Sequence, residues 1–492
     1  MARTAALALA FLALTVGDAQ ATTFRVVAVP GLGLEVLEEL AERGAVGLVV
    51  PGAGPETSRE IALAALERGE VRNSLRGGIP EGEPLVAVEV AATIPSGDGL
   101  VVVGIPDGGL QSNDRRYPVA VIGLGFEGLL TSDSTRIPGL VSIADVAPTA
   151  LGRDDGLGFQ PADEPANELR NLDARIDEKN DVHPWATLLA LVLVALLALA
   201  RPHAALAAFA ALLATNLVLG WAGVSDAWVV LLAVGLAVLV GGPLLAGLLA
   251  TPLALGVAFA LVLGAYLLAF ALDGTVVALS PFGPSQNARF YGLSNLLETL
   301  LLVPALAGAA LLARRFGAPG FALVALLAFV VVAGNRFGAD GGGAVVLGAG
   351  FAVLTLGLAE RARLRIVAAV LGLAVSLIGL DLATGGSSHV SDSVRGGPGE
   401  LAGDLADRVA LSWERTTSSP WTAALVGVLL LAFALLVART VSRAGWSREA
   451  ALPLALAAAL ATSLVVNDSP NDVLMGGLAA YLAVERGMLP RR

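Results

Sequence analysis

Residues 287–298 read NARFYGLSNLLE, and they lead into an apolar run that continues to residue 313. The stretch places an arginine, a tyrosine, two asparagines and a glutamate at the mouth of a helix long enough to cross a membrane. Polar groups in such a place are costly unless they face protein or water, so they indicate a functional surface. Three further polar clusters, at residues 335–340, 387–392 and 467–472, interrupt the apolar runs that follow.

The composition is that of an integral membrane protein with a soluble part attached. The chain has 492 residues, of which 56% are hydrophobic and 15% are charged, whereas a soluble domain carries about 25% charged residues. Cysteine is absent, which excludes disulfides, thiolate metal sites and cysteine nucleophiles. With only three histidines, no metal site and no cofactor are predicted. The net charge of −11 argues against nucleic acid as a partner.

The chain divides into four predicted parts. Residues 1–21 have the basic start, short apolar core and small-residue end of a signal peptide. Residues 22–155 alternate strand patterns with helical spacing, which predicts an α/β domain with a mostly parallel sheet. A helix capped at Thr57-Ser58-Arg59 is expected to continue through Arg68, and residues 156–184 are interpreted as a linker or juxtamembrane segment. Residues 185–492 form an all-α polytopic transmembrane domain.

Eleven membrane spans are predicted from the apolar runs. Arginines gather in most of the alternate turns between the spans, as at Arg314 and Arg315, and the positive-inside rule places those turns in the cytoplasm. The turn near Thr251 is uncharged, and Arg289, Arg336, Arg395, Arg408 and Arg415 depart from the pattern. Residues 22–184 are therefore expected outside the plasma membrane and the C-terminus inside. The predicted spans are 185–201, 203–221, 227–249, 252–272, 293–313, 319–334, 342–359, 364–383, 420–438, 449–466 and 471–485.

The soluble part resembles a known superfamily. PVAVIG at 118–123, LLTSDSTR at 129–136 and GLVSIADVAPT at 139–149 are similar to the closing part of alkaline-phosphatase-superfamily domains. The resemblance implies that fold and places a nucleophile position at Thr57 or Ser58. However, Pro30 stands where the family has a metal-binding aspartate, and the turn at 105–109 lacks the family's histidine. The resemblance thus implies an inactive domain; a phosphatase or phosphotransferase is the alternative.

The outer polar clusters supply the candidate site. Arg289 and Arg336 could hold a phosphate or pyrophosphate in bidentate fashion, although structural ion pairs would also account for them. Asn295 and Glu298 share one helix face, and Glu298 is either an acid/base or ion-coupling group or part of a plain interhelical hydrogen bond. The predicted catalytic residues are Glu298, Asp340, His389 and Asp468, and the predicted substrate-binding residues are Arg289, Tyr291, Asn295, Asn335, Arg336, Asn467 and Asp472.

The motifs at 289–295, 335–342 and 466–469 resemble a group of bacterial envelope membrane proteins with the same two-part layout. That resemblance implies no particular activity. We expect a bacterial protein that handles an anionic, lipid-linked cell-envelope substrate at its outer face, by transfer or translocation. Membrane lipid or a lipid-linked substrate is the expected partner, with envelope proteins as possible further partners. A scaffold that uses the phosphatase-like domain for partner binding is the other hypothesis.

Overall fold

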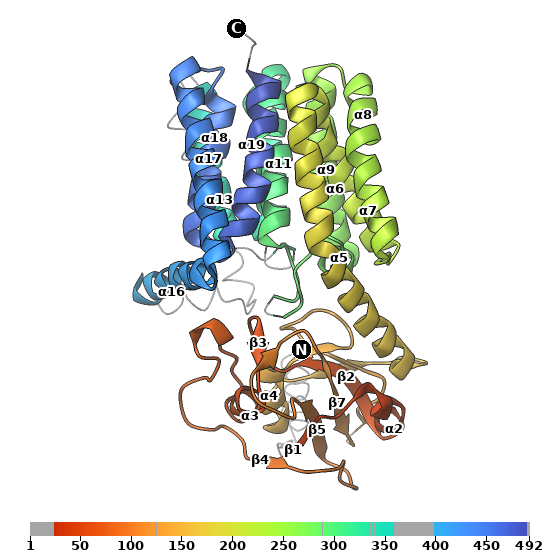
Figure 1. Cartoon of the computed structure of the whole chain (residues 1–492). Coiled ribbons are helices and arrows are strands. Elements are labelled where there is room, and N and C mark those ends of the chain that lie inside the picture. The colour runs from red at the N-terminus through yellow and green to blue at the C-terminus, as the bar shows by residue number, and fades with distance from the viewer. Residues whose placement is uncertain are drawn as a thin grey trace, which may run out of the picture. The chain divides into compact units, whose positions relative to one another are not determined.

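The computed structural model describes residues 24–123, 125–287, 289–334, 337–338, 341–358 and 398–489. The chain separates into two compact units that divide between Asp173 and Ala174. The first is a mixed α/β unit and the second is helical, as the sequence predicts at that level of detail (Figure 1).

The first unit is built on one sheet with the strand order β10-β8-β2-β7-β5-β1-β4, and β9 pairs with β2 beside that path. The central strands are apolar on both faces and fully buried, which accounts for their continuous apolar runs. The strands of this sheet are β1 (Arg25–Pro30), β2 (Gly44–Val50), β4 (Val88–Val90), β5 (Leu100–Ile105), β7 (Tyr117–Ile122), β8 (Leu129–Thr131), β9 (Leu140–Ser142) and β10 (Gly158–Gln160).

The sheet is mixed rather than mostly parallel. β1 is parallel to β4 and β5, but β7 is antiparallel to both of its neighbours, β2 and β5. The connection from β5 to β7 holds only the short strand β6 (Gln111–Ser112), which pairs with β3 (Glu56–Thr57). A parallel pair needs a longer crossover, usually a helix, so this short connection dictates the antiparallel return.

Three short helices cover this sheet: α2 (Leu37–Ala41), α3 (Arg59–Arg68) and α4 (Val146–Ala150). The predicted helix start at Ser58 is confirmed, because the Ser58 side chain accepts a hydrogen bond from the amide of Ile61. Gly69 ends the same helix in a left-handed conformation. The segment interpreted as a linker, 156–184, contains β10 and the first part of a long helix, α5 (Pro165–Ala200).

The second unit is a bundle of apolar helices typical of a multi-pass membrane protein. Its remaining helices are α6 (Pro202–Trp221), α7 (Ala227–Leu236), α8 (Gly242–Leu248), α9 (Pro252–Leu272), α10 (Thr275–Ala278), α11 (Asn295–Phe316), α12 (Ala318–Ala333), α13 (Gly341–Leu358), α16 (Pro398–Thr417), α17 (Pro420–Ala444), α18 (Ala451–Val466) and α19 (Pro470–Met488).

Among the described residues, seven helices are long and apolar enough to cross a membrane: α5, α6, the continuous α7–α8, α9, α11, α13 and α17. Two shorter apolar helices, α12 and α18, accompany them. The predicted count of eleven spans is therefore not confirmed, and the span expected at 364–383 lies outside the described residues.

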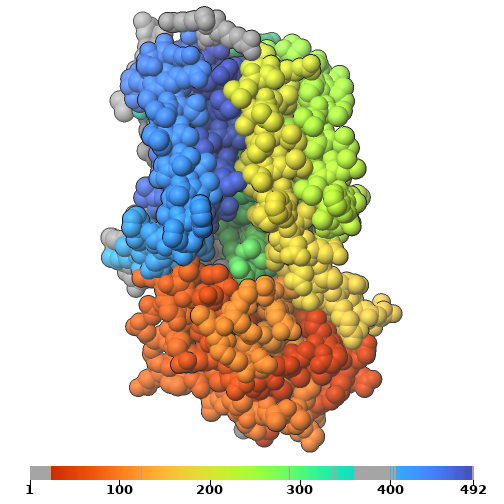
Figure 2. Space-filling view, in the orientation of Figure 1, coloured from red at the N-terminus to blue at the C-terminus, as the bar shows by residue number. Residues whose placement is uncertain are grey.

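α11 forms the centre of the helical unit, and every side chain from Leu296 to Leu312 is buried. α17 and α7–α8 lie at the surface of the unit, where Figure 2 shows them in blue and light green. Their exposed leucines and valines suit contact with lipid. Glu298 therefore sits in the best-buried helix of the bundle, one turn from its start.

The two ends of the helical unit differ in chemistry. The first turns of α11 and α19 lie at one end, and the last turn of α19 lies at the other (Figure 1). At this second end the buried carboxylate of Glu485 is 3.7 Å from Arg439 and Arg443 and 3.9 Å from Arg486. Arginines thus concentrate at the end that the sequence assigns to the cytoplasm, and the predicted site residues that are described lie at the opposite end.

Candidate functional site

Glu298 is a fully buried carboxylate in the first turn of α11. Ser294 caps this helix by accepting a hydrogen bond from the amide of Leu297. The Nδ2 atom of Asn467 donates to Glu298 Oε2 at 2.7 Å and to Ser463 Oγ at 2.8 Å. Asn467 is the residue at which α18 ends, so the contact joins two helices far apart in the sequence. The structure thus brings together Glu298 and Asn467, two of the predicted site residues.

A second set of contacts adjoins the first through residue 468. Asn295 Nδ2 donates to Asp468 Oδ1 at 3.0 Å, and Arg415 Nη1 lies 3.0 Å from Asp468 Oδ2. Arg415 also donates to the carbonyl of Asp468 and to Ser469 Oγ. Asp472, half-buried in the first turn of α19, interacts electrostatically with Arg415 and Asp468.

We call these residues the Glu298 cluster: Asn295, Glu298, Arg415, Ser463, Asn467, Asp468, Ser469 and Asp472. Five of them are predicted site residues, and they come from the starts of α11 and α19 and the end of α18. The cluster passes from a fully buried carboxylate to a half-exposed ion pair between Arg415 and Asp468. Polar side chains therefore connect the buried carboxylate with the partly exposed ion pair.

Arg415 is a functional candidate that sequence reasoning missed. It lies near the end of α16, in a stretch rich in acidic neighbours, which makes a local ion pair the natural expectation. Its actual partner is Asp468, more than fifty residues away. Its position in the sequence could have identified Arg415 as a candidate. Arg415 lies shortly before the apolar run of α17, which places it near the membrane surface.

The loop before α11 is fixed by buried polar side chains that sequence reasoning also missed. The ammonium group of Lys179 donates to the carbonyl of Pro284, and His183 Nδ1 lies 2.7 Å from the carbonyl of Pro281. Asn216 accepts a hydrogen bond from the amide of Phe282 at 3.0 Å. These contacts tie the loop that leads into α11 to α5 and α6.

Arg289 and Tyr291 lie in the second half of that loop, and both are half-buried. Arg289 donates to the carbonyl of Gly338 at 3.3 Å. Gly292 has a φ of +77°, and a Cβ there would lie 2.1 Å from the same carbonyl, so only glycine fits. Four predicted site residues, Asn335, Arg336, Asp340 and His389, lie outside the described residues.

The first unit has a groove of about 900 Å³ at the start of α3. Ser58, Arg59 and the turn at 107–109 line it, and Gly31 approaches Asp107 closely. These are the positions that the phosphatase resemblance singles out. Within the described parts of the chain, no group of three His, Asp or Glu side chains is placed to hold a metal ion.

The sequence and the fold were also compared with known proteins. No family model, no curated protein and no solved structure matches the chain. The candidate site therefore has to be interpreted from its own chemistry.

Proposed function

We propose that the protein is a multi-pass membrane protein that handles an anionic, lipid-linked cell-envelope substrate at the Glu298 cluster, by transfer or translocation. The observation that carries the proposal is the complete burial of Glu298, with Asn467 as a neutral donor to its carboxylate. A carboxylate in the apolar interior of a membrane protein costs several kcal/mol, about 2.5–3.5 on insertion scales. Ionisable groups within membrane helices mark substrate pathways and proton relays, which makes Glu298 a functional-site candidate.

The surroundings of Arg415 support an amphiphilic anion as the substrate. Val409 and Trp413 precede it on α16 and are exposed, so the same helix carries both apolar side chains and a guanidinium. An amphipathic helix of this kind lies in the membrane interface. A guanidinium binds phosphate in bidentate geometry, and Arg415 can exchange Asp468 for a phosphate at low cost because that ion pair is only partly buried.

Two chemical roles for Glu298 fit the proposal. In a transfer reaction, the hydroxyl oxygen of an acceptor forms a bond to the transferred group, and the bond between that group and the lipid phosphate breaks. The carboxylate of Glu298 takes the proton of the hydroxyl, and the lipid phosphate departs as the leaving group. In translocation, protonation of Glu298 changes the charge of the interior and thereby favours one of two conformations. Both roles require that substrate and proton reach the buried end of the cluster.

A scaffold role is the second candidate, and the groove of the first unit favours it. Exposed Ile79 and Leu110 line this groove next to Arg59 and Asp107, which suits a protein segment with both apolar and charged groups. A phosphatase role would need metal ligands at the same groove, and Pro30 and Asp107 alone do not provide them.

Lipid mass spectrometry of the purified full-length protein tests the proposal. The wild-type protein should retain a polyprenyl-phosphate-linked lipid, and a deletion strain should accumulate the same lipid. Glu298→Gln and Arg415→Gln should lower turnover or retention at least tenfold, whereas Arg408→Gln, two turns earlier on α16, serves as the matched control. Unchanged lipid retention and turnover in both cluster variants would remove the proposal and favour the scaffold.

A further inference from the structure

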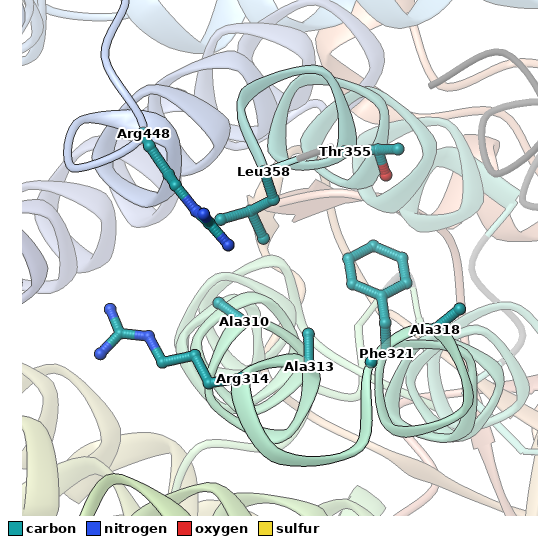
Figure 3. Close-up of a pocket in the computed structure, with 9 residues that line it drawn as sticks. Ala310, Ala313, Arg314, Ala318, Phe321, Thr355, Leu358 and Arg448 are labelled. Carbon is teal, nitrogen blue, oxygen red and sulfur yellow. The ribbon is translucent and has the colours of Figure 1, made fainter. Parts of the chain in front are cut away.

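A pocket of about 220 Å³ lies at the arginine-rich end of the helical unit, between α11, α12, α13 and the turn before α18 (Figure 3). Glu298 and Arg314 are sixteen positions apart on α11, so the pocket is about 24 Å along the helix from the Glu298 cluster. It is therefore separate from the candidate site already described.

The lining of this pocket is divided into a basic side and an apolar side. Arg314 and Arg448 extend along one side with Ala310 between them, and Phe321 and Ala318 stand on the other side (Figure 3). Leu358 and Ala313 complete the apolar wall. The hydroxyl of Thr355 is already used, because it donates to the carbonyl of Phe351 at 2.7 Å.

The two arginines have charge available for a ligand. Arg314 and Arg448 are both exposed, and neither forms an ion pair with a carboxylate anywhere in the part of the chain that the structure describes. The buried carboxylate of Glu485, at the same end of the helical unit, lies close to Arg439, Arg443 and Arg486 instead. Two like charges beside one pocket repel each other, so an anion between them is stabilised by both.

We infer that this pocket binds a membrane lipid with an anionic phosphate headgroup, with the phosphate between Arg314 and Arg448 and the start of an acyl chain against Phe321 and Leu358. The apolar wall selects a lipid over free phosphate, because inorganic phosphate gains nothing from alanine, leucine and phenylalanine side chains. The basic side selects an anionic lipid over a zwitterionic one, because basic clusters at a membrane surface attract anionic headgroups.

Native mass spectrometry of the full-length protein in detergent tests the inference, with phosphatidylglycerol and phosphatidylcholine as the probes. The wild-type protein should bind one phosphatidylglycerol in preference to phosphatidylcholine. The double variant Arg314→Gln/Arg448→Gln should weaken phosphatidylglycerol binding about thirtyfold, which corresponds to about 2 kcal/mol for two arginines. Arg315→Gln is the matched control, because Arg315 is adjacent and exposed but does not line the pocket.

A second variant tests the apolar wall. Ala313→Phe fills the pocket without changing any charge, and it should abolish phosphatidylglycerol binding. Three results would overturn the inference: equal binding of both lipids by the wild-type protein, displacement of the lipid by excess inorganic phosphate, or an equal loss in Arg315→Gln. If Ala313→Phe fails to fold, the exposed double variant decides alone, since surface glutamines leave the packing intact.

Discussion

The substitution Asn467→Ala should destabilise the helical unit through its contact with Glu298. Asn467 is 3% exposed and donates two hydrogen bonds, to Glu298 Oε2 at 2.7 Å and to Ser463 Oγ at 2.8 Å. Alanine removes both donors and leaves one buried carboxylate oxygen without its Asn467 donor. The loss of unfolding free energy caused by Asn467→Ala therefore depends on whether the carboxylate of Glu298 is present.

The free-energy cost of Asn467→Ala can be worked out from the two hydrogen bonds that the substitution removes. Hydrogen bonds between membrane helices contribute about 0.6 kcal/mol on average and up to about 1.7. Removing the donor from a buried acceptor costs about 1–3 kcal/mol, and more where the acceptor is charged. We therefore expect Asn467→Ala to lower the free energy of unfolding by about 2–3 kcal/mol in the wild-type background.

A double-mutant cycle isolates the contact between the two side chains. Glu298→Leu removes the buried carboxylate, while the bond from Asn467 to Ser463 remains available in that background. In that background Asn467→Ala loses only the bond to Ser463, so its cost should fall to about 1 kcal/mol. The free energies come from reversible unfolding by sodium dodecyl sulfate in mixed micelles, followed by tryptophan fluorescence.

Thr440→Ala is the control for this cycle. Thr440 is an equally buried polar residue whose hydroxyl accepts a hydrogen bond from Tyr481 and donates one to the carbonyl of Leu436, and it has no carboxylate among those partners. Its cost should be the same with and without Glu298→Leu. If Asn467→Ala costs the same in both backgrounds, the buried carboxylate does not depend on Asn467 and our interpretation of this contact is wrong.

Three further predictions concern the rest of the chain. Ser58→Ala removes the cap of α3 and should cost about 1 kcal/mol in urea unfolding followed by circular dichroism, whereas Ser58→Asp should retain most of that stability. Burial raises the pKa of Asp145 despite hydrogen bonds from two serine side chains and one backbone amide, so the folded first unit binds this proton more tightly than the unfolded chain does. Stability should therefore fall as the pH rises from about 4 towards neutral, and Asp145→Asn should reduce that dependence; an unchanged slope would contradict the assignment. Gly220→Ala would put a Cβ 2.1 Å from a carbonyl of α10 and should cost about 1–3 kcal/mol in thermal unfolding, whereas Gly235→Ala meets nothing within 4 Å and should be neutral or stabilising.

Most of the structural features that the sequence could predict depend on local patterns of residues. Ser58 and Gly69 bound α3 through short-range backbone requirements. The predicted apolar runs include the seven described helices that are long and apolar enough to cross a membrane, although the predicted count of eleven is not confirmed. The alternation of arginine-rich and polar turns also places the ends of the helices correctly relative to one another. This alternation is why Glu298 and Asn467 could be assigned to one surface from the sequence.

Contacts between distant parts of the chain could not be predicted in this way. Lys179 bonds to Pro284 and Arg415 pairs with Asp468, and neither contact leaves a periodic signal. The mixed sheet is a similar case, because the direction of β7 depends on the length of one connection rather than on the strand's own residues. Sequence reasoning found the end of the bundle that holds the candidate site but not all of the side chains that complete it.

Cysteine accessibility provides the most direct test of the claim that the Glu298 cluster lies at the exported face. The chain contains no cysteine, so a single substitution gives one labelling site without background. Ser418→Cys and Trp446→Cys place that site just before and just after α17, at its two ends. A membrane-impermeant maleimide should label Ser418→Cys in intact cells and Trp446→Cys only after the membrane is opened, and the reverse pattern, or labelling of both in intact cells, would contradict the account.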